Sequence, residues 1–353
     1  MTTFLATIFV LGILVFVHEL GHFLVAKKSG IKVERFSLGF PPKMIGKKIG
    51  DTEYCISWIP LGGYVKMAGE EPDKDEIKGE PWEFMSKPVG IRALVVAAGP
   101  IMNFILAIVV FWGIIFFEGK QEIHEDIAQV GLVAEGGPAD KAGIKPGDTI
   151  LSINGVKVTS FREMAQIIYQ QIEKPIEVKW LRDGKEYTAL ITTYKDKVLN
   201  EKGETTEIGK IGIGPSYTTV KIGIFKSFVE GVNTTIFILV ESVKFIVDLI
   251  TGAASIKLLG GPLFIVQTAG ETAKSGFVNL LSFLALLSVN LSFINVLPIP
   301  VLDGGHLLFL AIEKIKRSPL TLKQRATAQQ IGIAFLILLM IFITYNDLLR
   351  LMR

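Results

Sequence analysis

The sequence predicts a multi-pass α-helical membrane protein with four transmembrane helices, an inserted mixed α/β domain and a membrane-associated β-hairpin. Half of the 353 residues are hydrophobic and the mean hydropathy is +0.46, which a soluble globular domain rarely reaches. A bilayer-spanning helix needs about 20 apolar residues, and four stretches provide them. They lie at 2–26, 92–117, 278–297 and 328–349.

The chain is expected to divide into four parts. Residues 1–118 would form an N-terminal membrane core, 119–220 the inserted domain, 221–277 an interfacial amphipathic region and 278–353 a C-terminal membrane core. The net charge of +3 is spread along the chain without a long basic run. Nucleic acid is therefore not an expected partner, whereas membrane lipid is.

Lysine and arginine residues cluster in two short loops, which predicts the orientation in the membrane. Such loops stay in the cytoplasm, so both termini and the inserted domain are expected on the outer side. The basic residues are Lys27, Lys28, Lys32, Arg35, Lys43, Lys47 and Lys48 after the first span, and Lys314, Lys316, Arg317, Lys323 and Arg325 before the last.

Residues 222–250 are apolar on one helical face and charged on the other. This pattern predicts an amphipathic helix that lies in the membrane interface or packs on the helix bundle. A fifth span here would place the last basic loop outside, against the charge rule.

The inserted domain shows the pattern of a small α/β fold. The dipeptides Asn154-Gly155 and Asp183-Gly184 each separate two short strand-like runs, which predicts two tight hairpins. Ser160 and Glu163 have the spacing of a capping box, and a helix is expected to follow to about Gln171.

The first span carries the motif His18-Glu19-Leu20-Gly21-His22. Helical positions i and i+4 lie about 40° apart, so both imidazoles can reach one ion, with Glu19 placed to take a proton from a metal-bound water. The alternative is a pair of histidines packed between helices. Ionisable groups inside a span are costly and usually functional, which favours the metal site.

A catalytic zinc takes three protein ligands and keeps one position open, so a third ligand must come from elsewhere. Asp303 follows the third span, after Pro298 and Pro300 have broken the helix. With the predicted topology, His18 and Asp303 both arrive near the cytoplasmic side of the membrane. A helix cap remains the alternative role for Asp303, and His306 remains a rival ligand on spacing alone.

Three motifs resemble those of the site-2 protease family, in its bacterial regulator-of-sigma-E protease branch. They are HELGH at 18–22, AGPIMNF at 98–104 and NVLPIPVLDGG at 295–305, and they occur in the family's order. The resemblance implies an intramembrane zinc metalloendopeptidase of the bacterial inner membrane. It implies Zn²⁺ bound by His18, His22 and Asp303, and the family's LDG pattern favours Asp303 over His306.

The resemblance also implies Glu19 as the general base and single-span membrane proteins as substrates. Anti-sigma-factor-like proteins or signal-peptide remnants would be cut within the transmembrane segment, during regulated intramembrane proteolysis. Asn295 and Pro298 match family positions that hold the unwound substrate. Asn103 is expected only to pack between helices through a hydrogen bond.

Residues 55–67 form an apolar segment that the pair Gly62-Gly63 interrupts. It is expected to form the membrane-associated hairpin and to offer an edge strand that holds the substrate extended. A packed loop is the alternative.

The insert resembles a PDZ domain through the segments 135–139 and 142–148, with 130–133 expected as its carboxylate-binding loop. In the family this module faces the periplasm, and a peptide or substrate tail is its expected partner. The best-known members carry two such modules in tandem, whereas this chain has room for one.

Two other functions fit parts of the sequence. A non-proteolytic scaffold would use the PDZ-like module and a structural metal, but it would not need Glu19, and structural zinc takes a fourth protein ligand. A metal transporter would need metal-binding residues along a route, and the spans offer a single cluster. The sequence therefore favours the protease.

Overall fold

The computed structural model describes residues 2–70, 79–199 and 205–351. The chain forms two compact units. The helical unit comprises residues 1–115, 225–247 and 259–353, and the sheet unit comprises 116–224 and 248–258.

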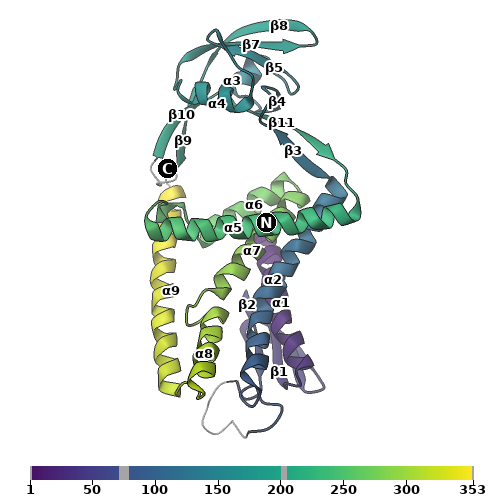
Figure 1. Cartoon of the computed structure of the whole chain (residues 1–353), viewed down its shortest axis with the longest axis vertical. Helices are drawn as coiled ribbons and strands as arrows, with labels where there is room; N and C mark the ends of the chain where they lie inside the picture. Colours follow the sequence, from purple (N-terminus) through teal and green to yellow (C-terminus); the bar gives the residue numbers. More distant parts are fainter. Residues whose placement is uncertain (1, 71–78, 200–204, 352–353) are drawn as a thin grey trace. The chain divides into compact units, whose positions relative to one another are not determined.

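Within the described residues, four helices are long and apolar enough to cross a membrane, as the sequence predicts. Their apolar windows are only 28%, 39%, 39% and 6% buried in chain order, which leaves broad hydrophobic faces for lipid. These helices are α1 (Thr2–Lys28), α2 (Val89–Glu118), α7 (Phe277–Val296) and α9 (Leu322–Leu351) (Figure 1).

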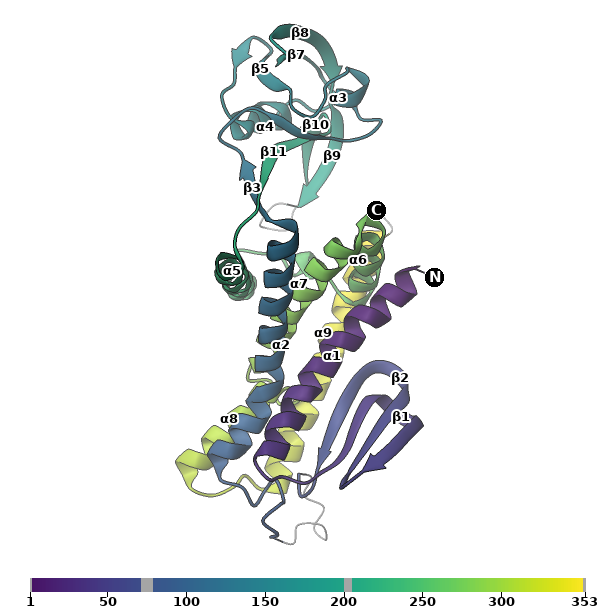
Figure 2. The same cartoon turned by 90° about the vertical axis from the view of Figure 1, so that its right-hand side faces the viewer.

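The amphipathic segment forms one continuous helix, α5 (Ile224–Thr251). It runs across α2 in Figure 1 and is seen end-on in Figure 2. Phe228 contacts Trp112 of α2, and Ser242 Oγ lies 2.8 Å from Asn290 Oδ1 of α7. The helix therefore packs on the bundle, and its location in the membrane interface stays a prediction.

Two further helices, α6 (Pro262–Ser275) and α8 (Asp303–Lys316), were not predicted, and a 3₁₀ turn (Ile256–Leu258) precedes α6. Helix α6 packs along α1, where Gly270 lies against Thr3. The amides of Gly261 and Phe264 at the start of α6 donate to the Asp347 carboxylate of α9, at 3.0 and 3.1 Å. This carboxylate satisfies amides that a helix start leaves without partners.

The strands β1 (Val33–Ile49) and β2 (Thr52–Met67) form a folded hairpin beside α1 (Figure 2). The first half of β1 pairs with residues 63–67 and also with 53–56, while its second half pairs with 52–57. Residues 55–67 thus form strands rather than a packed loop. The association of this hairpin with the membrane stays a prediction.

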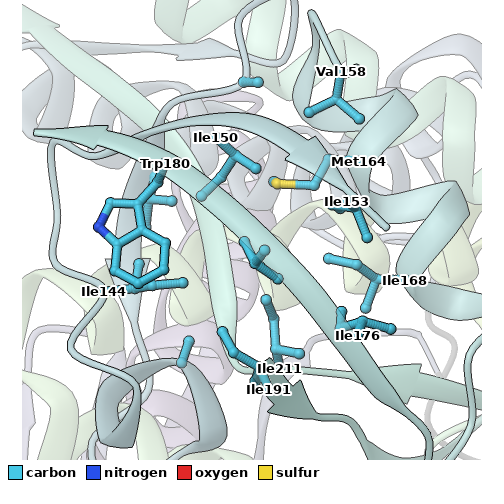
Figure 3. Packing of buried hydrophobic residues seen from close by; sticks show 14 residues of the cluster. Ile144, Ile150, Ile153, Val158, Met164, Ile168, Ile176, Trp180, Ile191 and Ile211 are labelled. Carbon is cyan, nitrogen blue, oxygen red and sulfur yellow. The ribbon is translucent and has the colours of Figure 1, made fainter. Parts of the chain in front are cut away.

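The sheet unit contains a four-stranded sheet in the order β6-β5-β7-β8, a three-stranded sheet β3-β11-β4 and the pair β10-β9. Its core consists mainly of branched aliphatic side chains, together with Met164, Trp180 and two alanines (Figure 3). The elements are β3 (Lys120–His124), β4 (Val130–Val133), α3 (Pro138–Lys141), β5 (Thr149–Ile153), β6 (Val156–Lys157), α4 (Phe161–Tyr169), β7 (Pro175–Arg182), β8 (Lys185–Thr192), β9 (Tyr194–Leu199), β10 (Thr205–Lys210) and β11 (Ile213–Val220).

Both predicted hairpins are confirmed, with Asn154 and Asp183 at φ of 51° and 50° in their turns. The predicted cap is present too, because Ser160 Oγ accepts from the Glu163 amide at 3.2 Å. The Thr159 amide donates to the Glu163 carboxylate and holds the pKa of that group below its usual range.

The role of residues 130–133 in carboxylate binding stays a prediction. These residues form strand β4, which pairs with β11 through Val133 and Ile213. A side chain on Gly131 would collide with the backbone of Pro215 and Ser216, so glycine permits the close approach of the two strands.

A buried ion pair joins α2 to α8. The Arg92 guanidinium donates twice to the Glu313 carboxylate, at 3.2 and 2.5 Å, and the two side chains are 5% and 11% exposed. Arg325 at the start of α9 lies 3.6 Å from the same carboxylate. A single acidic group thus holds basic groups from two helices.

We expect Arg92→Ala to lower the free energy of unfolding by about 3–5 kcal/mol, because it leaves the Glu313 carboxylate buried with less compensation. Denaturant titration in mixed micelles measures the change. Lys32→Ala is the control, since Lys32 and Asp51 form an exposed pair at 3.8 Å and such pairs contribute under about 1 kcal/mol. Equal effects of the two substitutions would contradict a stabilising role of the buried pair.

Candidate metal centre

The structure brings together two histidines of α1 and one aspartate at the start of α8. Asp303 Oδ2 lies 3.1 Å from His18 Nε2 and 3.5 Å from His22 Nε2. The two Nε2 atoms are 3.2 Å apart, and the three side chains are 11–18% exposed. Among the described residues, they form a group whose ligand atoms all lie within 4.8 Å of one another.

Asp303 reaches the histidines because the chain turns sharply between α7 and α8. Helix α7 ends at Val296 and α8 begins at Asp303, after a short proline-containing turn. Side chains on Gly304 and Gly305 would collide with the backbone carbonyls of Val296 and Ile299. The two glycines therefore let the first turn of α8 pack against the end of α7.

Small residues also bring α2 close to the histidine pair. A Cβ on Gly21 would collide with the Ala98 carbonyl, and a Cβ on Gly99 would collide with the imidazole rings of His22 and His18. Close approach of this kind is what small residues permit between membrane helices. The AGP segment of α2 thus leaves room for the two rings.

Each histidine is held at its other ring nitrogen by α2. His22 Nδ1 lies 2.9 Å from the Val95 carbonyl oxygen, so it must carry the proton and donate. His18 Nδ1 lies 3.3 Å from the Asn103 side-chain amide. The sequence assigned Asn103 to helix packing only, since its contact with His18 depends on the crossing of α1 and α2.

The cluster fits a tetrahedral zinc ion. Zinc binds imidazole nitrogen and carboxylate oxygen at about 2.0–2.2 Å, which separates tetrahedral ligands by about 3.3–3.5 Å. The three separations observed, 3.1, 3.2 and 3.5 Å, are close to that spacing. Asp303 Oδ2 is buried and accepts no hydrogen bond, so it is available as a ligand atom.

The cluster opens into a cavity of about 880 Å³ within the helical unit. His306 lines this cavity but is not a member of the three-residue group. Among its other lining residues, the charged ones are Glu19, Glu34, Lys66, Glu70, Arg92 and Arg325. A polar lining of this kind is compatible with water at the cluster.

Glu19 lies between the cluster and the edge of the hairpin sheet. Its carboxylate accepts from the Val65 amide of β2, and a Cβ built on Gly63 would lie 3.1 Å from its Cγ. Electrostatic interactions link it to His18, His22 and Asp303. The acid of the sequence motif is therefore held beside the cluster by a backbone contact.

The four predicted substrate-binding residues lie in different settings. Asn295 lines the cavity and Gly63 faces Glu19, as described above. Gly62 lies against the ring of Phe40, whose edge a Cβ would meet. Pro298 is exposed in the turn between α7 and α8, outside the residues that line the cavity.

A buried cluster of two imidazoles and a carboxylate, with an acid beside it and membrane-length helices around it, defines a candidate metal-dependent hydrolase of the membrane. Comparison with known proteins assigns the family: the chain belongs to peptidase family M50, whose sequence model matches residues 6–339. Membership makes this chain a peptidase.

Curated relatives match over almost the whole chain. The regulator of sigma-W protease RasP of Bacillus subtilis is 34% identical, covering 99% of this chain and 99% of that protein. A putative zinc metalloprotease of Agrobacterium fabrum is 36% identical, covering 97% and 94%. The zinc metalloprotease RasP of Bacillus licheniformis is 33% identical, covering 99% and 100%.

A solved structure also matches part of the chain. The PDZ domain of an SdrC-like protein from Listeria monocytogenes is 22% identical, covering 27% of this chain and 92% of that domain, with a TM-score of 0.21.

We expect Gly99→Ala to abolish stable zinc binding, because the added methyl group would displace both imidazole rings. Gly113→Ala is the matched control in the same helix, since a Cβ there meets nothing within 4 Å. Alanine favours a helix over glycine by up to about 1 kcal/mol, so neither change should unfold α2. Metal analysis of the purified variants measures bound zinc. Full zinc occupancy in Gly99→Ala would contradict the tight fit.

Proposed function

We propose that this chain is an intramembrane zinc endopeptidase that cuts the transmembrane segments of single-span membrane proteins. The observation that carries the proposal is the buried cluster of His18, His22 and Asp303, two of whose members lie within a membrane-length helix. Family membership supports the peptide bond as the target, and the position of the cluster in apolar helices supports a membrane substrate.

In this proposal His18, His22 and Asp303 hold a zinc ion. The ion supplies a water of lowered pKa and polarises the scissile carbonyl when it is bound. Three protein ligands leave a coordination position open, which is typical of catalytic rather than structural zinc. His306 has no ligand role here, because Asp303 occupies the place beside the imidazole pair.

Glu19 is the proposed general base. Its carboxylate takes a proton from the attacking water and then donates that proton to the leaving amine nitrogen. The hydrogen bond from the Val65 amide orients the carboxylate beside the cluster. The charged lining of the cavity supports access of water to this point.

A helical substrate has to be unwound before its peptide bonds can be attacked. We propose that residues 62–67 bind the unwound segment as an added strand, since residues 63–67 form an outer strand of the hairpin sheet, next to β1 in the described register. Gly63 keeps this edge close to Glu19, and Gly62 lets it pass over Phe40. Asn295 lines the same cavity and would contact the substrate backbone, while Pro298 shapes the turn that precedes Asp303.

Location and partners follow from the sequence patterns and the relatives. We place the chain in the bacterial inner membrane, with the basic loops in the cytoplasm and both termini outside. The sheet unit is proposed as a PDZ-like module on the periplasmic side that binds a peptide or substrate tail. Anti-sigma-factor-like proteins and signal-peptide remnants are the proposed substrate classes, and one relative is named a regulator of sigma-W protease.

We expect Glu19→Gln to retain zinc and to lose cleavage by about 10²–10⁴-fold, because a neutral amide cannot accept the proton. Asp303→Ala should lose both zinc and cleavage, since it removes a ligand. Cleavage of a purified single-span substrate in detergent, with metal analysis of each variant, measures both properties. Undiminished cleavage by Glu19→Gln would refute the mechanism, and absence of cleavage by the unmodified chain would leave a non-proteolytic scaffold as the better account.

We expect removal of the metal by a chelator to abolish cleavage reversibly. Zinc should restore activity and Mg²⁺ should not, because imidazole ligands select zinc while Mg²⁺ requires an oxygen-rich octahedral site. The same cleavage assay measures recovery at increasing metal concentration. Activity that survives complete demetallation would exclude zinc from the reaction.

A further inference from the structure

The side-chain amide of Asn103 is buried beside the metal cluster. The residue lies on α2 with zero exposure, and its Nδ2 atom is 3.3 Å from His18 Nδ1. Its Oδ1 atom is also buried and has no hydrogen-bond partner. A buried amide oxygen without a donor costs about 1–3 kcal/mol, so this arrangement needs an explanation.

The tautomer of His18 provides that explanation. His18 Nε2 faces Asp303 and His22, and it can bind a metal only through its lone pair. The proton of the neutral ring must then reside on Nδ1, which makes Nδ1 a donor. A donor at Nδ1 needs an acceptor opposite, and the Nδ2 group of an amide cannot accept.

A half-turn of the amide about its last side-chain bond exchanges Oδ1 with Nδ2 and changes little else. In that orientation Oδ1 accepts from His18 Nδ1–H, and the unpaired oxygen gains its donor. His22 has the equivalent arrangement, with its Nδ1 beside the Val95 carbonyl oxygen at 2.9 Å. Both rings would then present Nε2 to the metal in the same tautomer.

We propose that Asn103 is a positioning residue whose amide oxygen fixes the metal-binding tautomer of His18. The inference rests on the proposed zinc site. Outer hydrogen bonds of this kind orient metal-ligating histidines and raise their basicity, and their loss costs about 10–100-fold in metal affinity.

The position of the amide is fixed by the packing of α7 on α2. Ser288 Oγ of α7 donates to the Asn103 backbone carbonyl at 2.7 Å, and Ser292 Oγ donates to the Pro100 carbonyl at 2.8 Å. Both serines are buried. The two helices therefore hold the Asn103 backbone in place, which leaves two orientations for its side-chain amide.

Two substitutions separate an accepting role from a donating or packing role. Asn103→Asp keeps an acceptor of the same shape and removes the donor, whereas Asn103→Leu keeps the branching of the side chain and removes both. Gly113→Ala is the control, because it lies in the same helix and its added Cβ meets nothing within 4 Å. Zinc dissociation constants come from competition with a chromophoric chelator, and cobalt-substituted protein reports ligand geometry through its visible absorption.

We expect Asn103→Leu to bind zinc about 10–100-fold more weakly and to alter the cobalt spectrum. Asn103→Asp should retain the affinity and spectrum of the unmodified chain, and Gly113→Ala should too. If Asn103→Leu fails to fold, Asn103→Asp still tests the inference. It removes the N–H donor, so zinc binding would weaken if the amide donates to His18, and it keeps an oxygen acceptor, so zinc binding would be retained if the amide accepts.

Weak zinc binding by Asn103→Asp, or unchanged binding by Asn103→Leu, would overturn this inference and leave the proposed function intact. Absence of zinc binding in the unmodified chain would instead overturn the proposed function, and the inference with it.

Discussion

The geometry of the site depends on the close crossing of α1 and α2. Gly21 and Gly99 remove the side chains that would stand between the two helices, and the histidine rings occupy the space that Gly99 leaves. Lipid chains are as apolar as leucine side chains, so packing and hydrogen bonds must hold such helices together. Here the contact of His22 with the Val95 carbonyl contributes to both the helix pair and the site.

The spans and the histidine motif could be predicted because their signals are local. Apolar length identifies a membrane helix, and two histidines one turn apart share a face of any helix that contains them. The hairpins around Asn154 and Asp183 were equally predictable, since tight turns need residues that tolerate a positive φ. Asp303 lies far from the histidines in the sequence, so its prediction as a ligand rested on the depth of its span and on the resemblance to a family.

The features that could not be predicted from the sequence depend on packing between segments that are far apart in the chain. Helix α6 is too short for a span, and it is fixed by α1 and by the Asp347 carboxylate of α9. The pairing of β4 with β11 also joins segments that are far apart in the chain. The role inferred for Asn103 likewise depends on a contact between residues 85 positions apart.

The position of residues 62–67 beside Glu19 has a consequence for sequence preference, if these residues bind the substrate as proposed. Successive side chains of an extended peptide point to opposite faces, so a segment paired with these residues would direct every second side chain toward the cavity. The intervening side chains would face away from the charged lining. Selection among substrates at this surface would therefore follow a two-residue period, with size and polarity restricted at alternate positions and nearly unrestricted between them.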